Sequence, residues 1–231
     1  IYRASGNRNR MATMLINLGE FARMRGDAGL AIPRYEEALS IGREIGNREL
    51  ERIGLLNLGS VQVSIGRHQT ALDNINAALA LLSGTPWGGA SEAHGMLCEA
   101  QLGLGHRAAA LDAASAALRL AYAQQRPENR GMAWRAMGLA LAAAEGSGLD
   151  VAPARQLIAS IDATMAADAG ACFTRSAELL RDAQARASLV ATLLSHARYA
   201  RAENEPAGLA DALEAEAEAL ARELGLKPRP A

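Results

Sequence analysis

The sequence NLGEFARMRGD occupies residues 17–27, and the related sequence NLGSVQVSIGR occupies residues 57–67. In both stretches Asn-Leu-Gly is followed, after six residues, by a second glycine, and the stretches are forty residues apart. The same shift of 40 also brings Ala31 onto Ala71. A register kept over this distance indicates an internal repeat, in which neighbouring units bury apolar faces that one unit alone would leave exposed.

Three further copies follow with decreasing regularity. A third copy, at a shift of 39, has Cys98 and Gly105 in the places of the two glycines. A fourth begins around Gly138 and loses its register in the stretch SGLDVAP, and a fifth is recognised only near Ser195. The sequence therefore predicts about five repeats.

Each copy divides into two helices. Apolar residues recur at helical spacing up to Gly26, Gly66 or Gly105, where a left-handed C-terminal cap favours a residue without Cβ. Asp27 follows directly and is a good N-cap for the second helix. The sequence therefore predicts helical hairpins with short glycine turns.

Small residues are expected where the two helices of a hairpin meet. Gly19 and Ala31 allow close approach, while Tyr35 and Ile75 fill the spaces around them. The third copy departs from this pattern, because Ala114 stands where Tyr35 is expected.

The composition agrees with an all-α protein. Half of the 231 residues are hydrophobic but only 3% are aromatic, and alanine, the best helix former, is abundant. The formal net charge of −1 provides no global field for nucleic acid or an anionic membrane, and no apolar run is long enough to span a bilayer. The two cysteines favour a reducing, cytoplasmic setting. The start, IYRASGNRNR, has neither a Met nor an apolar signal segment, so we expect a piece of a longer protein.

The order of small residue, glycine, alanine, large apolar residue and alanine resembles the tetratricopeptide repeat. The resemblance is strongest over residues 12–46 and 52–85, fair over 91–125 and weak beyond about residue 145. The forty-residue period resembles the long-helix type found in kinesin light chains and in C-terminal arrays of bacterial signalling ATPases and transcriptional regulators. The resemblance implies a right-handed α-solenoid of about five antiparallel helix pairs.

The resemblance leads to a division of the chain. We expect a lead-in at 1–10, three clear helix pairs at 11–125, a divergent fourth pair at 126–170, a divergent fifth pair or capping helices at 171–225, and a tail at 226–231.

In such arrays the first helix of each pair lines the inner, concave face, where ligands commonly bind. The positions that this implies for a ligand or peptide groove are Thr13, Ile16, Asn17, Glu20, Arg23, Leu56, Asn57, Ser60, Ser64, Glu92, Glu99, Arg135, His196 and Tyr199.

Asn17 and Asn57 are the most informative pair in this set. Their amides can both donate and accept, so a ladder of them could hold the backbone of an extended peptide of any sequence. The alternative is that both amides are simply solvated. A groove that clamps a terminal carboxylate uses Lys and Arg beside such asparagines, whereas the only Lys is Lys227 and Met96 replaces the next Asn.

The sequence contains no CxxC, HExxH, GxSxG or phosphate-loop motif. His94 and Cys98 lie four residues apart, but no further Cys or His lies nearby to complete a zinc site, and a buried thiol beside a surface imidazole is the better interpretation. We expect no catalytic residue, metal or cofactor, and no nucleic-acid site, because the arginines alternate with acids and lack stacking aromatics.

Two functions follow as hypotheses. The first is a non-catalytic docking or effector-sensing array of a larger bacterial signalling or transcription-regulatory protein, which binds a protein, a peptide, a small effector or other domains of its parent chain. The second is a freestanding adaptor that binds a peptide in its groove. A homodimer is a further hypothesis, because the ends of repeat arrays expose apolar surface.

Overall fold

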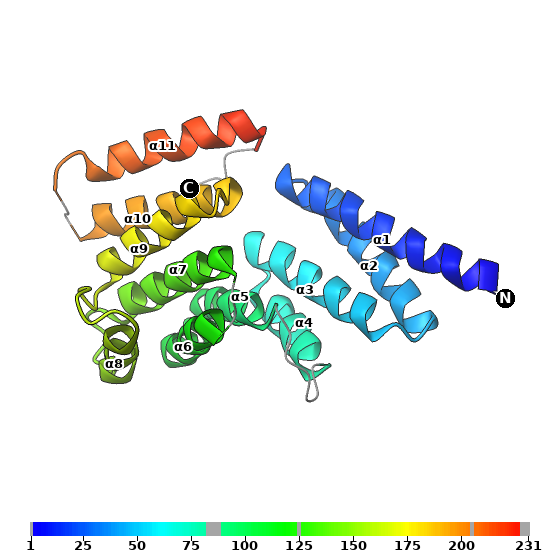
Figure 1. Cartoon of the computed structure of the whole chain (residues 1–231), viewed down its shortest axis with the longest axis horizontal. Helices are drawn as coiled ribbons and strands as arrows, with labels where there is room; N and C mark the ends of the chain where they lie inside the picture. Colours follow the sequence, from blue (N-terminus) through cyan, green and yellow to red (C-terminus); the bar gives the residue numbers. More distant parts are fainter. Residues whose placement is uncertain (1, 82–88, 124–125, 204–205, 227–231) are drawn as a thin grey trace. The chain divides into compact units, whose positions relative to one another are not determined.

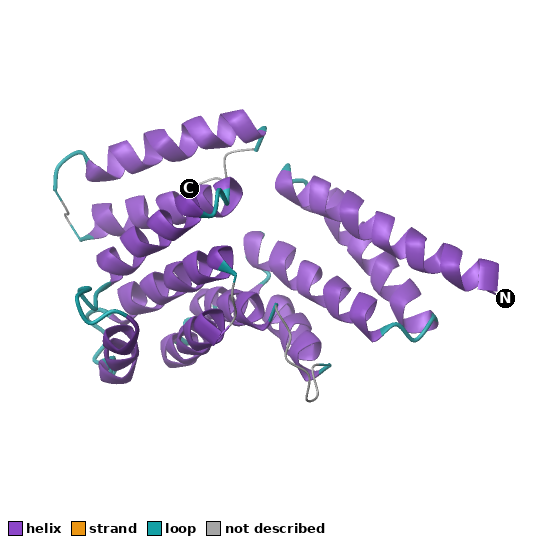
Figure 2. Cartoon of the chain, in the orientation of Figure 1, coloured by secondary structure: helices purple, strands orange, loops and turns teal. Residues whose placement is uncertain are grey.

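The computed structural model describes residues 2–81, 89–123, 126–203 and 206–226, and every regular element in these ranges is an α-helix (Figure 2). The predicted all-α fold class is therefore confirmed for the described chain. The helices, labelled in Figure 1, fall into two compact units. The last residues of the expected tail, 227–231, lie outside the described ranges.

The first unit is made of two helical hairpins. It contains α1 (Tyr2–Met24), α2 (Ala28–Glu44), α3 (Arg48–Ser64) and α4 (His68–Ala80). Each helix packs on the next, and α1 also contacts α3. The expected lead-in at 1–10 is part of α1, which begins at Tyr2.

The turns between paired helices have the predicted chemistry. Gly26 has φ 70°, its N–H donates to the Arg23 carbonyl at 2.9 Å, and the next N–H, of Asp27, donates to the Ala22 carbonyl at 2.9 Å. The Asp27 carboxylate in turn accepts from the Leu30 N–H at 3.0 Å. Two hydrogen bonds thus close the end of α1, and the N-cap starts α2.

The second unit contains α5 (Ala90–Gly103), α6 (Arg107–Ala123), α7 (Pro127–Ala144), α8 (Ala152–Ile161), α9 (Ala169–Asp182), α10 (Arg186–Ala202) and α11 (Leu209–Leu224). Helices α5, α6 and α7 pack in succession, and α9, α10 and α11 do the same. The helix that packs along α7 is α9, whereas the backbone of α8 lies closest to α6.

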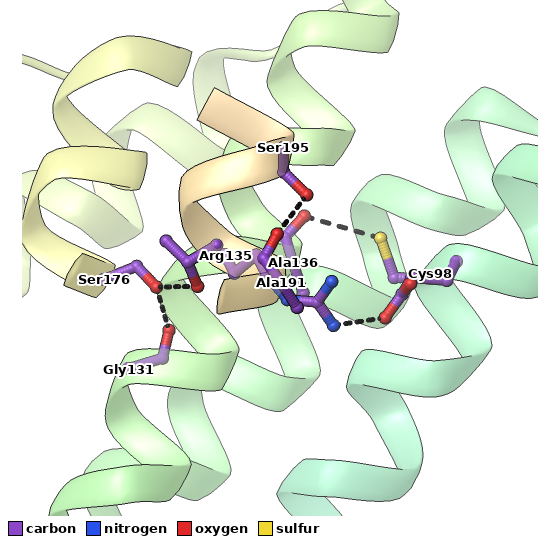
Figure 3. Close-up of polar contacts among 9 residues, drawn as sticks. Cys98, Gly131, Arg135, Ala136, Ser176, Ala191 and Ser195 are labelled. Carbon is purple, nitrogen blue, oxygen red and sulfur yellow. Dashed lines mark hydrogen bonds and ion pairs between the residues drawn. The ribbon is translucent and has the colours of Figure 1, made fainter. Parts of the chain in front are cut away.

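The fourth hairpin therefore differs from the expected pair at 126–170. Its helices are α7 and α9, and the segment 145–168, with α8, is an insertion between them. The expected boundary near residue 170 falls inside α9. A polar cluster joins the two helices to α10: the buried Ser176 hydroxyl donates to the Gly131 carbonyl at 2.7 Å and lies 3.0 Å from the Thr192 hydroxyl (Figure 3).

The turn between α9 and α10 contains no glycine, and Gln184 takes the position that glycine has in the other turns. Its φ is 54°, its N–H donates to the Arg181 carbonyl at 3.0 Å, and the N–H of Ala185 donates to the Leu180 carbonyl at 2.9 Å. These are the hydrogen bonds of the Gly26 turn, made by a residue whose Cβ disfavours this backbone conformation.

We therefore expect Gln184→Gly to raise the free energy of unfolding by about 1 kcal/mol, because it relieves the left-handed strain. The measurement is urea unfolding followed by far-UV circular dichroism. Gln184→Ala is the matched control, since it removes the same side chain but keeps the Cβ. An equal gain from Gln184→Ala would contradict this explanation.

The small positions of the first helices receive large side chains from the second helices. A Cβ added at Gly19 would lie 2.6 Å from a ring carbon of Tyr35, and one added at Gly59 would lie 2.5 Å from Ile75. In the third hairpin Cys98 and Ala114 take these places, and both are fully buried. The larger residue on the first helix is thus matched by a smaller one on the second.

Candidate functional site

The predicted inner-face residues lie on the first helices of the hairpins, α1 and α3 in the first unit and α5, α7 and α10 in the second. The repeat register places some of them at equivalent positions, as it does Asn17 and Asn57. The two units differ in what these side chains contact. We use this difference to choose the candidate site, because a ligand needs polar groups that the fold does not already use.

Asn17 on α1 is exposed and Asn57 on α3 is half-buried. Within the described residues, neither side-chain amide has a hydrogen-bond partner. Each amide keeps its donors and its acceptor available for a ligand. Asn17 and Asn57 occupy equivalent positions of consecutive repeats in one unit, and we call the two residues together the amide face.

The hydroxyls near the amide face are less available. Thr13 donates to the Asn9 carbonyl at 3.0 Å, and Ser64 donates to the Val61 carbonyl at 2.7 Å, both within their own helices. Ser60 is half-buried on α3. Leu56, expected to line the groove, is only 6% exposed and belongs to the core instead.

Glu20 and Arg23 form a closed pair on α1. The Arg23 guanidinium donates to the Glu20 carboxylate at 2.8 and 2.5 Å, and the Tyr35 hydroxyl donates to it at 3.1 Å. Burial alone would raise the pKa of Glu20, but the bonds from Arg23 and Tyr35 outweigh it and hold this pKa below its ordinary value. The carboxylate therefore stays ionised and tied to the protein, and Arg23 is not a free cation for a ligand.

Glu99 and Arg135 are paired in the second unit. The Arg135 guanidinium on α7 donates to the Glu99 carboxylate on α5 at 2.5 Å, and the two side chains are 17% and 22% exposed (Figure 3). Beside them Cys98 is fully buried with its Sγ 3.5 Å from the Ala136 carbonyl, and burial raises the pKa of its thiol. This arrangement links neighbouring hairpins and leaves the thiol protonated.

His196 and Tyr199 on α10 pack around Phe173 of α9. The His196 ring is stacked on Phe173 with centroids 5.5 Å apart and is only 7% exposed, which differs from the accessible position expected for it. The Tyr199 ring packs against the same ring with centroids 5.8 Å apart, and the Tyr199 hydroxyl donates a long hydrogen bond, 3.4 Å, to the Glu145 carboxylate. Glu92, the remaining candidate, is exposed in the first turn of α5.

A hollow of about 270 Å³ lies in the insertion and was not expected from the sequence. Its polar lining includes Glu145, Arg155 and Asp168. Burial, together with the charges of Glu203 and Asp168, raises the pKa of Glu145 despite the hydrogen bond from Tyr199. The stretch EGSGLD at 145–150 is the one signal of this insertion in the sequence. The described residues contain no group of three or more His, Cys, Asp or Glu side chains placed to hold a metal ion.

The tetratricopeptide repeat family matches residues 10–84, which include the amide face and nearly the whole first unit. These residues are tetratricopeptide repeats. Repeats of this family form modules for protein–protein interaction. The predicted recognition of the family from the spacing of Gly19, Gly26, Gly59 and Gly66 is confirmed for this segment.

Beyond the tetratricopeptide segment the comparisons concern the fold alone. The chain is similar to the crystal structure of BtubC (BKLC) from P. vanneervenii, with a TM-score of 0.61 and 16% sequence identity, over 100% of this chain and 87% of that one. No curated protein sequence matches the chain significantly. None of the described helices is long and apolar enough to cross a membrane.

Proposed function

We propose that this chain is a non-catalytic interaction module whose amide face binds an extended segment of a partner protein. The observation that carries the proposal is the pair of unpartnered amides, Asn17 and Asn57, at equivalent positions of consecutive tetratricopeptide repeats. A side-chain amide can donate to a peptide carbonyl and accept from a peptide N–H, and a repeat presents such groups at regular intervals along an extended chain.

The charged candidates support a ligand held by its backbone rather than by a terminal carboxylate. Arg23 and Arg135 already contact Glu20 and Glu99, and separating either pair for a ligand would leave a partly buried carboxylate without its cation. The asparagines require no such exchange. The partner segment is therefore expected to be internal to its chain and tolerant of sequence changes.

The test is the variant Asn17→Ala with Asn57→Ala. Short peptides are first selected from a random library on the unchanged protein, and their affinities for both proteins are then measured by fluorescence anisotropy. We expect the double variant to bind at least about tenfold more weakly, which corresponds to about 1.4 kcal/mol or less than 1 kcal/mol per amide. Its circular dichroism and unfolding should stay unchanged, since neither amide has a partner in the fold.

The matched control is Asn76→Ala, which removes an exposed asparagine from α4. This variant should bind the selected peptides with unchanged affinity. Equal affinities for the control and the double variant would overturn the amide face as the site.

We further propose that the module works in the cytoplasm as a docking or effector-sensing part of a larger signalling or transcription-regulatory protein. The long repeat period and its likeness to arrays of such proteins support this assignment. The alternative is a freestanding adaptor. Reading the coding sequence on both sides distinguishes them: an ATPase, cyclase or DNA-binding domain supports the first, and nearby stop codons support the adaptor.

A further inference from the structure

Helix α1 has an apolar face that no described residue covers. Met11, Met14, Leu18, Phe21 and Met24 are 42%, 65%, 54%, 60% and 41% exposed, and their spacing places them along one side of the helix. Of the large apolar side chains exposed in the described chain, only Leu30 and Ile65 lie elsewhere. We call these five residues the α1 stripe. Such a concentration marks a contact surface.

The repeat register shows what kind of element fits this stripe. A shift of 40 places Met14, Leu18 and Phe21 on Gly54, Leu58 and Val61 of α3, which are all buried. Helix α2 packs on α3 there, since a Cβ added at Gly54 would lie 3.1 Å from the Cβ of Leu39.

Helix α7 repeats the arrangement in the second unit. Its equivalent residues, Ala133, Met137 and Ala140, are at most 1% exposed, and α6 packs on α7. In α3 this face therefore packs against α2, the second helix of the hairpin before it, and α6 holds the corresponding place next to α7. The element that fits the α1 stripe is a helix lying on α1 as α2 lies on α3.

The last helix, α11, differs from α1 in the polarity of its exposed face. Helix α11 presents Asp211, Ala215, Glu218 and Arg222 to solvent, so that its outer face is polar. A polar outer face is typical of a repeat that ends an array. The apolar exposure of α1 is thus not a general property of the terminal helices of this fold.

Charge decides the chemistry of the covering helix. Of the arginines on and next to α1, Arg8 is paired with Glu44 of α2 and Arg23 with Glu20, whereas Arg10 and Arg25 have no ion-pair partner among the described residues. Arg8 and Arg10 line a hollow of about 520 Å³ beside Met11, Met14 and Leu18, and the Arg25 guanidinium lies 5.5 Å from the Phe21 ring. Acidic side chains on a docking helix would be attracted to these arginines, whereas the α1 helix of a second copy would bring the same positive charges against them.

We propose that the α1 stripe is a second binding surface, which takes an amphipathic helix of a partner protein with small or aliphatic residues on one side and acidic residues along its flanks. The binding is independent of the amide face. Met residues and a single Phe suit this role, because flexible thioether side chains adapt to the shape of the incoming helix.

The test uses two synthetic helical peptides of 17 residues, the length of α2. Both carry the same Leu and Ala stripe; one has Glu on its flanks and the other has Lys. With the full chain at low salt, we expect the Glu peptide to bind at least about tenfold more tightly than the Lys peptide, and to lose this advantage as salt is added.

The variant Leu18→Gln with Phe21→Gln should abolish binding of the Glu peptide. Since both side chains are more than half exposed, the fold should survive, which circular dichroism checks. Leu30→Gln with Ile65→Gln is the matched control and should bind normally, as should the double asparagine variant. Equal binding of both peptides, binding of neither, or a dimer that Leu18→Gln with Phe21→Gln dissociates would overturn the proposal; the dimer would make a second copy the occupant.

Discussion

The variant Gly59→Cys is expected to lose about 1–3 kcal/mol of unfolding free energy, because it overpacks a filled site between α3 and α4. The added Cβ would lie 2.5 Å from Cγ1 and 3.1 Å from Cδ1 of Ile75, whose side chain is fully buried. Ile75→Ala alone is expected to lose about 2–5 kcal/mol, because it leaves a cavity.

The double variant, Gly59→Cys with Ile75→Ala, should lose at least about 1 kcal/mol less than the sum of the single losses. The reason is that the thiol enters the space that the isoleucine leaves. The third hairpin already has this combination, since Cys98 and Ala114 are both fully buried at the equivalent positions.

Urea unfolding of the four proteins measures this coupling. Gly95→Ala is the control for adding a Cβ to a helical glycine in open space, because a Cβ at this position would have no other side chain or helix within 4 Å. That variant should gain about 0.5–1 kcal/mol from its better helix propensity. If the two single losses simply add, a larger residue on the first helix is not compensated by a smaller residue on the second helix, and the explanation given for Cys98 and Ala114 is wrong.

Much of the fold is predictable because its signals are local. The glycine turns follow from residues that tolerate a left-handed backbone, and Gly26, Gly66 and Gly105 have φ between 70° and 79°. Gln184 makes an equivalent turn without such a signal, since glutamine has no preference for this conformation. The sequence therefore does not indicate where α9 ends and α10 begins.

The pairing of helices in the fourth hairpin was not predictable for a different reason. The stretch VAPARQLIASI forms a helix, α8, as its apolar spacing favours, and it follows α7 directly in the chain. Local pattern does not say which helix packs on α7, because the choice depends on the side chain that fits Gly138. The expectation of a pair at 126–170 took the nearest helix.

The candidate site also has a part that local sequence signals predict and a part that depends on tertiary packing. The repeat register alone placed Asn17 and Asn57 at equivalent positions, which the structure keeps accessible. The ion pair of Glu99 with Arg135 joins residues 36 apart, and the stacking of His196 on Phe173 depends on the unpredicted α7–α9 pairing. Sequence reasoning could list inner-face positions but not those that the fold itself uses.

Phe173→Ala is expected to lose about 3–5 kcal/mol, because it empties the centre of the fourth hairpin. The ring is fully buried, contacts His196 and Tyr199, and lies where a Cβ on Gly138 would approach it to 2.9 Å. Phe173 lies 35 residues after Gly138, whereas Ile75 follows Gly59 by 16. If α8 were the partner of α7, the regular spacing would bring Ala154 to this place instead.

A double-mutant cycle distinguishes these pairings. Gly138→Ala combined with Phe173→Ala should show a coupling of at least about 1 kcal/mol, since the new methyl group occupies space that the ring has left. Gly138→Ala combined with Ile158→Ala, in the fully buried position of α8, should be additive within about 0.5 kcal/mol, because the backbone of α8 does not lie along α7. Coupling in the second cycle and additivity in the first would make α8 the partner of α7.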